Sequence, residues 1–383
     1  MSKPDPKQGG VLSSQQLRAL VREGGLSAKA PVEERQYQPG SLDLRLGEKA
    51  HRMFCSFFPD PFQTIESRLT RPKLYQADLV MYDVDLQGGA VLDKGHVYLV
   101  PLLEEVALPS DVAGKCNPKS TTGRLDIFTR TLTDSMASFD KIPRGYHGPL
   151  YLEIVPRSFP VKVAAGMSLN QLRLFSGDRS IGDHELRTMH GTFSLLYNKQ
   201  DRPLSEEELR ISEGLFLRVD LHGDGEAIGY RAKKTTEVVD LTKIAYYEPC
   251  DFWEPLRRNR YDTLVLEPEE FYILASKERI RVPPDYAAEM VAYEAACGEL
   301  RTHYAGFFDP GFGYGTGELR GTPIVLEVRA HDVPFLIHDG QTFFKVLFER
   351  MQERPEKVYG ERIGSSYQFQ GLTLSKHFGP YSG

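Results

Sequence analysis

The stretch PLYLEIVPRSFPVKVAAGMSLNQLRLF, residues 149–175, aligns without a gap with PIVLEVRAHDVPFLIHDGQTFFKVLFE, residues 323–349. Glu153 meets Glu327 in this alignment, so the offset is 327 − 153 = 174 residues. The same offset aligns HVYLVPLLEEVALPSD, residues 96–111, with EFYILASKERIRVPPD, residues 270–285. Agreement of two separate blocks at one offset predicts that the chain of 383 residues is an internal duplication.

Both copies have the pattern of β structure. Apolar residues alternate with others, as at Leu150, Leu152 and Ile154, which is the period of a strand with one buried face. The 34 glycines and 25 prolines break these runs at short intervals, as in a sandwich or barrel. We therefore expect a mainly β protein with two tandem β-barrel or jelly-roll-type domains and a few short helices.

The predicted domains are residues 1–200 and 201–383, because the charged, strand-poor stretch 198–210 is the best candidate for a linker. One helix is predicted to begin near Ser13 or Ser14 and to end at Gly24-Gly25. A second is predicted from Tyr286 to Leu300, which is rich in alanine and glutamate.

Composition excludes several classes of protein. Lys and Arg number 47 against 53 acidic residues, a net charge of −6, which disfavours nucleic acid as a partner. No apolar run reaches the roughly 20 residues of a membrane span, and MSKPDPKQGG lacks the apolar core of a signal peptide. The four cysteines form no CxxC pair, so we interpret them as scattered thiols. A soluble, cytoplasmic protein without a membrane partner is expected.

The segment KSTTGR, residues 119–124, is the sharpest local feature. It combines two cations, three hydroxyls and a glycine, which together suit a bound anion, although a polar turn after a strand has the same composition. It is not a Walker loop, because GxxxxGK[ST] is absent. The candidate binding residues are Lys119, Ser120, Thr121, Thr122, Gly123 and Arg124.

Glu153 and Glu327 stand inside apolar strands at matching positions of the repeat. Burial would raise the pKa of such a carboxyl and favour general acid–base chemistry, whereas the solvent face of an edge strand would give it no role. Asp309-Pro310-Gly311-Phe312 is either a turn or a binding element for a sugar hydroxyl beside an aromatic ring. The tail SSYQFQG, residues 365–371, is either disordered or folded over a ligand.

Together these segments resemble the dCTP deaminase branch of the dUTPase-like family. GVLSSQQLRALVREGGL resembles its opening helix, and QPGSLDLRLG its first signature strand. KSTTGR is similar to its RSSxxR phosphate motif, GPLYLEI and TPIVLEV to its catalytic strand, and FFDPGFG to its IDPGW turn. Tyr359 and Gln370 match its closing C-terminal segment. The resemblance implies two tandem dUTPase-like domains.

The resemblance also implies an activity, the hydrolytic deamination of dCTP to dUTP and ammonia. Glu327 or Glu153 would be the base and Ser120 would orient water or the nucleobase, while residues 119–124, Asp309, Phe312, Tyr359 and Gln370 would bind the substrate. Mg²⁺ would bind through the triphosphate. A zinc site is not expected, since Pro249-Cys250 is followed by Asp-Phe-Trp and not by the zinc signature.

Three matters stay open at this point. The chain could instead be a dUTPase-type pyrophosphatase or a non-catalytic nucleotide sensor. The base could come from either half, although a site shared across the halves would pair Ser120 and Arg124 with Asp309, Glu327 and Gln370. A homo-oligomer, trimeric or dimeric, is expected from the resemblance.

Overall fold

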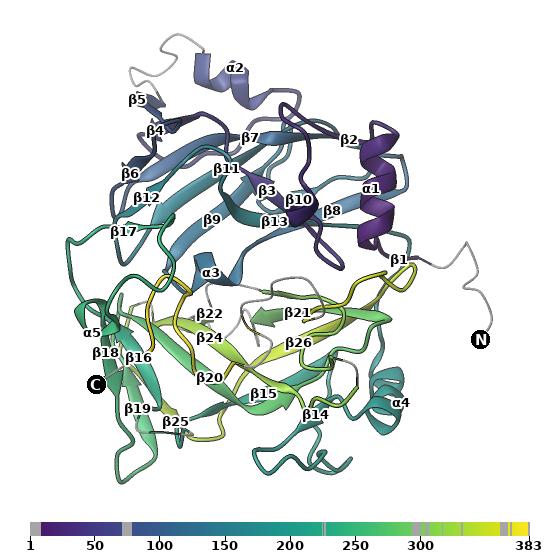
Figure 1. Cartoon of the computed structure of the whole chain (residues 1–383), viewed down its shortest axis with the longest axis vertical. Coiled ribbons are helices and arrows are strands. Elements are labelled where there is room, and N and C mark those ends of the chain that lie inside the picture. Colours follow the sequence, from purple (N-terminus) through teal and green to yellow (C-terminus); the bar gives the residue numbers. More distant parts are fainter. Residues whose placement is uncertain are drawn as a thin grey trace.

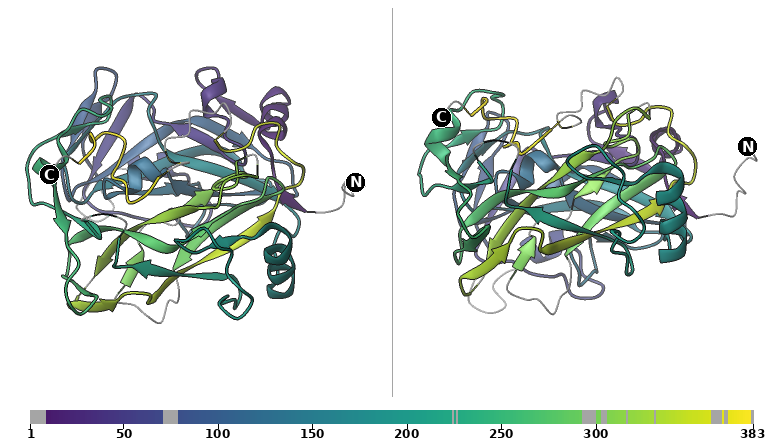
Figure 2. Two further views of the ribbon diagram at one scale, coloured as in Figure 1. Left: turned by 60° about the horizontal axis from the view of Figure 1, so that its bottom comes forward. Right: turned by 90° about the horizontal axis from the view of Figure 1, so that it is seen from below.

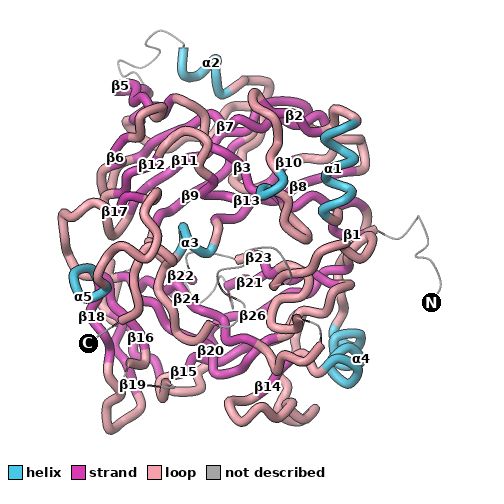
Figure 3. The backbone as a smooth tube through the Cα atoms, viewed as in Figure 1, coloured by secondary structure: helices cyan, strands magenta, loops and turns pink. Residues whose placement is uncertain are grey.

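The computed structural model describes residues 9–70, 79–223, 225, 227–292, 300–302, 306–315, 317–330, 332–360, 367 and 370–381. Most of this part of the chain is strand, which confirms the predicted β class (Figure 3). No described helix has the length and apolar character needed to span a bilayer.

The duplication is confirmed strand by strand. Shifting the N-terminal strands by 174 residues places them on the C-terminal strands: for example, β8 (Val112–Pro118) falls on β21 (Tyr286–Ala292), and β13 (Ser168–Ser176) on β26 (Thr342–Arg350). The pairing repeats as well, since β8 pairs with β13 and β21 pairs with β26, both antiparallel. The other matching pairs are β6 (Ala90–Leu92) with β19 (Thr263–Leu266), β7 (Val97–Ala107) with β20 (Phe271–Ile280), β11 (His147–Pro156) with β24 (Thr322–Ala330), and β12 (Val161–Val163) with β25 (Phe335–His338).

The remaining strands extend the two repeats. In the N-terminal half they are β1 (Gly10–Val11), β2 (Leu26–Ala28), β3 (Leu42–Arg45), β4 (Lys49–Met53), β5 (Val80–Asp85), β9 (Ile127–Leu132) and β10 (Lys141–Ile142). In the C-terminal half they are β14 (Leu196–Tyr197), β15 (Leu215–Asp220), β16 (Gly229–Ala232), β17 (Val239–Asp240), β18 (Trp253–Leu256), β22 (Leu300–Thr302) and β23 (Phe307–Phe308).

The described strands form separate sheets in the two halves, joined by one small shared sheet. The N-terminal half has a sheet in the order β1-β13-β8-β10, with β3 beside β13, and another in the order β5-β4-β7-β11-β9, with β2 beside β7. The C-terminal half has a large sheet in the order β18-β16-β20-β15-β26-β21-β23, with β24 beside β20, and a small one of β19 and β25. Strand β17 crosses over to pair in parallel with β12, which ties the halves together.

The helices are few and short, as predicted. They are α1 (Ser14–Arg22), α2 (Ile65–Thr70), α3 (Ser120–Gly123), α4 (Asp183–Phe193), α5 (Pro249–Phe252) and the 3₁₀ turn Glu34–Gln36. The opening helix is confirmed: Ser13 caps α1 in a capping box with Gln16. Helix α4 had no sequence signal that we recognised. It lies between the last N-terminal strand and β14, and the domain boundary near residue 200 remains a prediction.

The second predicted helix is wrong. Residues 286–292 form strand β21, and residues 293–299 lie outside the described part of the chain. Alanine and glutamate favour a helix only weakly, and pairing of all seven residues of β21 with β26 overrides that preference. The repeat offset already contained the answer, because 286 − 174 = 112 is the first residue of β8.

The two halves face each other with α3 at their boundary (Figure 1). A continuous apolar cluster joins the N-terminal core to Trp253, Phe271, Ile273 and Val325 of the C-terminal half. The C-terminal segment, yellow in Figures 1 and 2, returns to this boundary and lies against α3. Phe378 anchors that segment, since its ring is buried against Phe252 and Trp253, at 5.4 and 5.9 Å between centroids.

Candidate active site

The predicted anion-binding segment forms one tight turn of helix after strand β8. The amides of Thr122 and Gly123 both donate to the Lys119 carbonyl oxygen, at 2.8 and 3.0 Å. The Thr122 hydroxyl is buried and donates to the Leu169 carbonyl oxygen at 2.8 Å, so it fixes the turn to β13. Ser120, at the start of α3, is the exposed hydroxyl of the turn. We call residues 119–124 the anion loop.

Glu327 of the C-terminal half lies directly against this loop. A Cβ atom built at position 123 would overlap the Glu327 carboxylate, so glycine is required there by the close approach and not by its backbone angle. Glu327 is in the middle of β24, which pairs with β20 on one side and β22 on the other. The expected composite arrangement, with the anion loop from one half and a strand glutamate from the other, is therefore present.

The Glu327 carboxyl is only 6% exposed. Burial raises its pKa to about 8, with Asp126 raising it further and Arg124 opposing both. No hydrogen bond from a described residue holds the carboxylate. A buried carboxyl with free lone pairs and a pKa near neutrality can take a proton from water and return it, which is the behaviour of a general base.

Arg124 connects the loop to the C-terminal segment. Its guanidinium donates to the Thr373 carbonyl oxygen at 2.9 Å and to the Gln370 side-chain oxygen at 2.6 Å, and it stacks on the Tyr367 ring at 3.9 Å. Gln370 in turn donates to the Pro323 carbonyl oxygen on β24 at 3.2 Å. The tail thus bridges the anion loop and the strand that carries Glu327.

A second group of charges surrounds Lys119. Its ammonium forms an ion pair with Asp43 of β3, which is buried and has its pKa raised by desolvation, against the attraction of Lys119. Lys376 of the tail faces the same pair, and the pKa of Lys376 is lowered by burial and by Lys119. Two cations next to one carboxylate leave a net positive charge at this end of the loop.

The turn at Asp309 lies on the C-terminal side of this group. The Asp309 carboxyl is buried, and burial raises its pKa to about 6 although Arg173 lowers it from 3.8 Å away. Gly40 donates its backbone N–H to Asp309. Phe312 packs in the C-terminal core and against Tyr359, at 5.4 Å between ring centroids. Tyr359 donates its amide to the Pro310 carbonyl oxygen at 2.7 Å, which fixes the turn.

Glu153, the rival base, has a different environment. It is buried on β11, and the Arg130 guanidinium of β9 donates to its carboxylate, with the Arg130 Nε at 2.9 Å. Arg130 also stacks on Phe139 at 3.7 Å. Within the described residues, the contacts of Glu153 include none to the anion loop. A carboxylate held by a guanidinium is a poor base, because the cation stabilises its ionised form.

The described residues include no group of three or more His, Cys, Asp or Glu side chains placed to hold a metal ion. Cys55, Cys116 and Cys250 are free thiols, and Cys297 lies outside the described residues.

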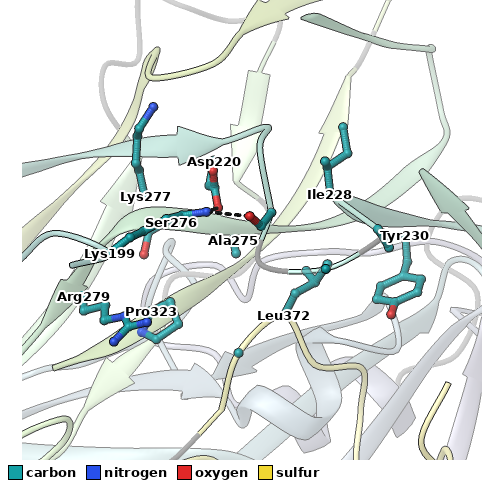
Figure 4. A pocket seen from close by; sticks show the side chains of 14 residues that line it. Lys199, Asp220, Ile228, Tyr230, Ala275, Ser276, Lys277, Arg279, Pro323 and Leu372 are labelled. Atoms are coloured by element: carbon teal, nitrogen blue, oxygen red, sulfur yellow. Dashed lines mark hydrogen bonds and ion pairs between the residues drawn. The ribbon is translucent and has the colours of Figure 1, made fainter. Parts of the chain in front are cut away.

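The largest cavity lies beside this site and not in it. It has a volume of about 250 Å³ and is walled by the bulged part of β20, by β15 and β16, and by Gly371 and Leu372 of the tail (Figure 4). Its cations are already paired: Lys199 with Asp220 at 2.5 Å, and Arg279 with Asp201 at 2.7 Å. Neither the anion loop nor Glu327 lines it, so the geometry of the charged groups is the better guide to the chemistry.

Sequence reasoning missed four members of the site: Asp43, Arg173, Tyr367 and Lys376. Asp43 lies within the quoted segment QPGSLDLRLG and Tyr367 within SSYQFQG, so a signal existed for these two. Arg173 and Lys376 reach the site only through tertiary packing.

Comparison with known proteins agrees with this arrangement. The family model described as the 2'-deoxycytidine 5'-triphosphate deaminase N-terminal domain matches residues 8–178, and the one for the C-terminal domain matches residues 183–378. The crystal structure of 2'-deoxycytidine 5'-triphosphate deaminase from Agrobacterium tumefaciens is 45% identical, with a TM-score of 0.82, and the match covers 91% of this chain and 100% of that one.

Shorter relatives match about half of the chain. A protein of Corynebacterium kroppenstedtii named "dCTP deaminase, dUMP-forming" is 34% identical over 167 residues, which is 43% of this chain and 81% of the relative. A protein of the same name from a Parafrankia species is 35% identical over 168 residues, or 43% of this chain and 75% of the relative.

Proposed function

The chain belongs to the 2'-deoxycytidine 5'-triphosphate deaminase family, and we propose that it hydrolyses dCTP to dUTP and ammonia. The observation that carries this proposal is the contact between Glu327 and Gly123 of the anion loop. It places a carboxyl with a pKa of about 8 beside the groups that suit a triphosphate. The Agrobacterium relative, which matches along nearly the whole chain, is named for deamination alone.

Glu327 is the general base in this scheme. The ionised carboxylate takes a proton from water while the water oxygen bonds to C4 of the cytosine ring. The protonated carboxyl then delivers that proton to ring N3 or to the amino group. Cleavage of the C4–N4 bond releases ammonia and leaves a carbonyl oxygen at C4, so one water molecule is consumed.

The anion loop and its neighbours hold the substrate. Ser120 offers an exposed hydroxyl to orient water or the base, while Lys119, Arg124 and Lys376 carry the charge that a triphosphate requires. Mg²⁺ enters with the triphosphate, whose oxygens it prefers. The tail contact of Arg124 through Gln370 and Tyr367 would then close the site over the phosphates.

A second candidate function is release of pyrophosphate after deamination, giving dUMP. Two observations favour it. Asp43 and Asp309 form a pair of interacting buried carboxyls beside Lys119, where they could act on a phosphate. The shorter relatives are named for a dUMP product. We rank it second because the full-length match carries no such name.

One assay separates these functions. The protein is incubated with dCTP and Mg²⁺, and with dUTP in parallel, while ammonia and pyrophosphate are measured. Ammonia without pyrophosphate is the expected result, and equal amounts of both from dCTP would establish the second candidate. Pyrophosphate from dUTP without ammonia from dCTP would identify a pyrophosphatase. Tight dCTP binding with neither product would identify a nucleotide sensor.

A further inference from the structure

The anion loop and Glu327 belong to different halves, so their separation depends on how the halves are held together at this point. One buried ion pair spans the gap directly beside them. Asp126 follows the anion loop by two residues, and Arg329 follows Glu327 by two residues on β24. Both side chains are buried, and the Arg329 guanidinium pairs with the Asp126 carboxylate.

Asp126 is fixed by its surroundings in the N-terminal half. Its φ angle is +55°, a left-handed conformation that aspartate tolerates better than most residues, and its amide donates to the Gly123 carbonyl oxygen at 2.8 Å. The Ser158 hydroxyl donates to the Asp126 carboxylate at 2.6 Å. Movement of Asp126 would therefore move Gly123, which touches Glu327.

Arg329 is fixed on the other side. Residues two apart on a strand point to the same face, so Arg329 and Glu327 point together towards the loop. The Arg329 guanidinium also donates to the Glu269 carbonyl oxygen. The guanidinium thus joins the loop, β24 and the turn before β20 in one place.

The repeat shows that this pair is particular to one side of the molecule. The counterparts of Asp126 and Arg329 at the 174-residue offset are Leu300 and Val155, which cannot form an ion pair. On that side the cation lies on the glutamate itself, in the pair of Arg130 with Glu153. On the Glu327 side the cation lies one step away, and the glutamate is left without a partner.

We propose, on the basis of the function proposed above, that the Asp126–Arg329 ion pair is a positioning device for Glu327. It fixes the anion loop against the catalytic strand and neutralises the negative charge of Asp126 next to the base. Arg329 is held off Glu327 by its bond to Asp126, so the base stays free to accept a proton. Neither residue touches the reacting atoms.

The charges facing Glu327 make this testable. They are Arg124 and Asp126 from the loop side, with the Tyr367 phenol from the tail. Strand β20 places Ile273 opposite Glu327, and β22 places Thr302 opposite Val328, so these strands present no ionisable residue at those positions. Removing the Arg329 charge leaves Asp126 uncompensated, and a like charge beside a carboxylate disfavours its ionisation.

The test measures the ionisation of Glu327 in four proteins: wild type, Arg329→Met, Asp126→Asn and the double variant. The midpoint is read from the carboxyl ¹³C signal of labelled glutamate, assigned with Glu327→Gln, and from the acid limb of kcat for dCTP. We expect Arg329→Met to raise both midpoints by about one pH unit and to lower kcat about tenfold below the midpoint. Asp126→Asn should lower both, and the double variant should return them towards wild type.

Controls separate positioning from general stability. Arg218→Met breaks another ion pair with a buried glutamate, Glu278, and should lower the melting temperature without moving either midpoint. Arg329→Lys keeps the charge and should keep the midpoints. Unmoved midpoints in Arg329→Met would overturn the proposal. Because the ¹³C titration needs no turnover, a shift there without ammonia release from wild type would contradict the deaminase function and leave the positioning role standing.

Discussion

The two strand glutamates occupy equivalent places in the repeat, yet their neighbours give them opposite properties. Arg130 stabilises the charge of Glu153, whereas Glu327 is buried without a bonded cation and has its pKa raised to about 8. Only the second arrangement gives a carboxyl that exchanges protons near neutral pH. This asymmetry assigns the base to the C-terminal half.

The raised pKa of Glu327 predicts a pH dependence of stability. Its folded-state pKa of about 8 exceeds the ordinary value of 4.5, so the folded protein binds more protons between these values and the free energy of unfolding falls as pH rises through them. Glu327→Gln removes this cost. We expect its melting temperature relative to wild type to increase from pH 5 to pH 8, by roughly 2–4 °C for each kcal/mol relieved. Thermal unfolding at several pH values measures it, and a difference that stays constant with pH would contradict the assignment.

Lys376 carries a second prediction at this scale. It faces Lys119 and Asp43, and the tail is held there by the Ser375 hydroxyl, which donates to the Thr121 carbonyl oxygen at 3.0 Å. Lys376→Gln should weaken dCTP binding about tenfold, since a charge-assisted contact to phosphate contributes about 1.5–3 kcal/mol. Calorimetry with dCTP measures this, with Lys234→Gln as an exposed control. Equal affinity of the two variants would remove Lys376 from the site.

At the scale of elements, the strands of the second half were predictable from the first. The offset of 174 residues carried each strand pair across, including β21, where composition alone had indicated a helix. The register of a sheet records which residues pair, while helix propensity records only a weak local preference. Helix α4 had no counterpart in the repeat and was missed for that reason.

The tail is an element whose seat can be loosened from a distance. Phe378 is buried among Phe252, Trp253 and Tyr247, well along the chain from Gln370. Phe378→Ala should release the segment from the core, raise KM for dCTP several-fold and lower stability by about 3–5 kcal/mol. Phe378→Leu is the matched control and should show a smaller change in both. Steady-state kinetics and chemical unfolding test this, and an unchanged KM in Phe378→Ala would show that the tail does not close the site.

At the scale of the whole molecule, the site lies within one chain because both contributing halves are covalently linked. Arg124→Ala and Glu327→Gln each remove one side of it. We expect a refolded mixture of the two variants to remain inactive, since no chain then carries both sides intact. Recovery of about a quarter of wild-type activity would instead show that halves of different chains build the site, as in a homo-oligomer with sites between subunits.

The limits of sequence reasoning follow from this architecture. Motifs predicted Lys119, Arg124, Asp309 and Gln370 as members of one site, because each was recognisable locally. Asp126 and Arg329 are 203 residues apart and carry no motif, so their pairing emerges only when the halves pack. The choice between Glu153 and Glu327 likewise depended on Arg130, whose partner no local pattern reveals.

The central claim is that Glu327 activates water beside the anion loop. The most direct measurement is ammonia release from dCTP by Glu327→Gln and by Glu153→Gln, with dCTP affinity measured for both. We predict that Glu327→Gln loses at least about a hundredfold in kcat while still binding dCTP, and that Glu153→Gln keeps most of its turnover. Full turnover in Glu327→Gln, with loss in Glu153→Gln, would contradict the account.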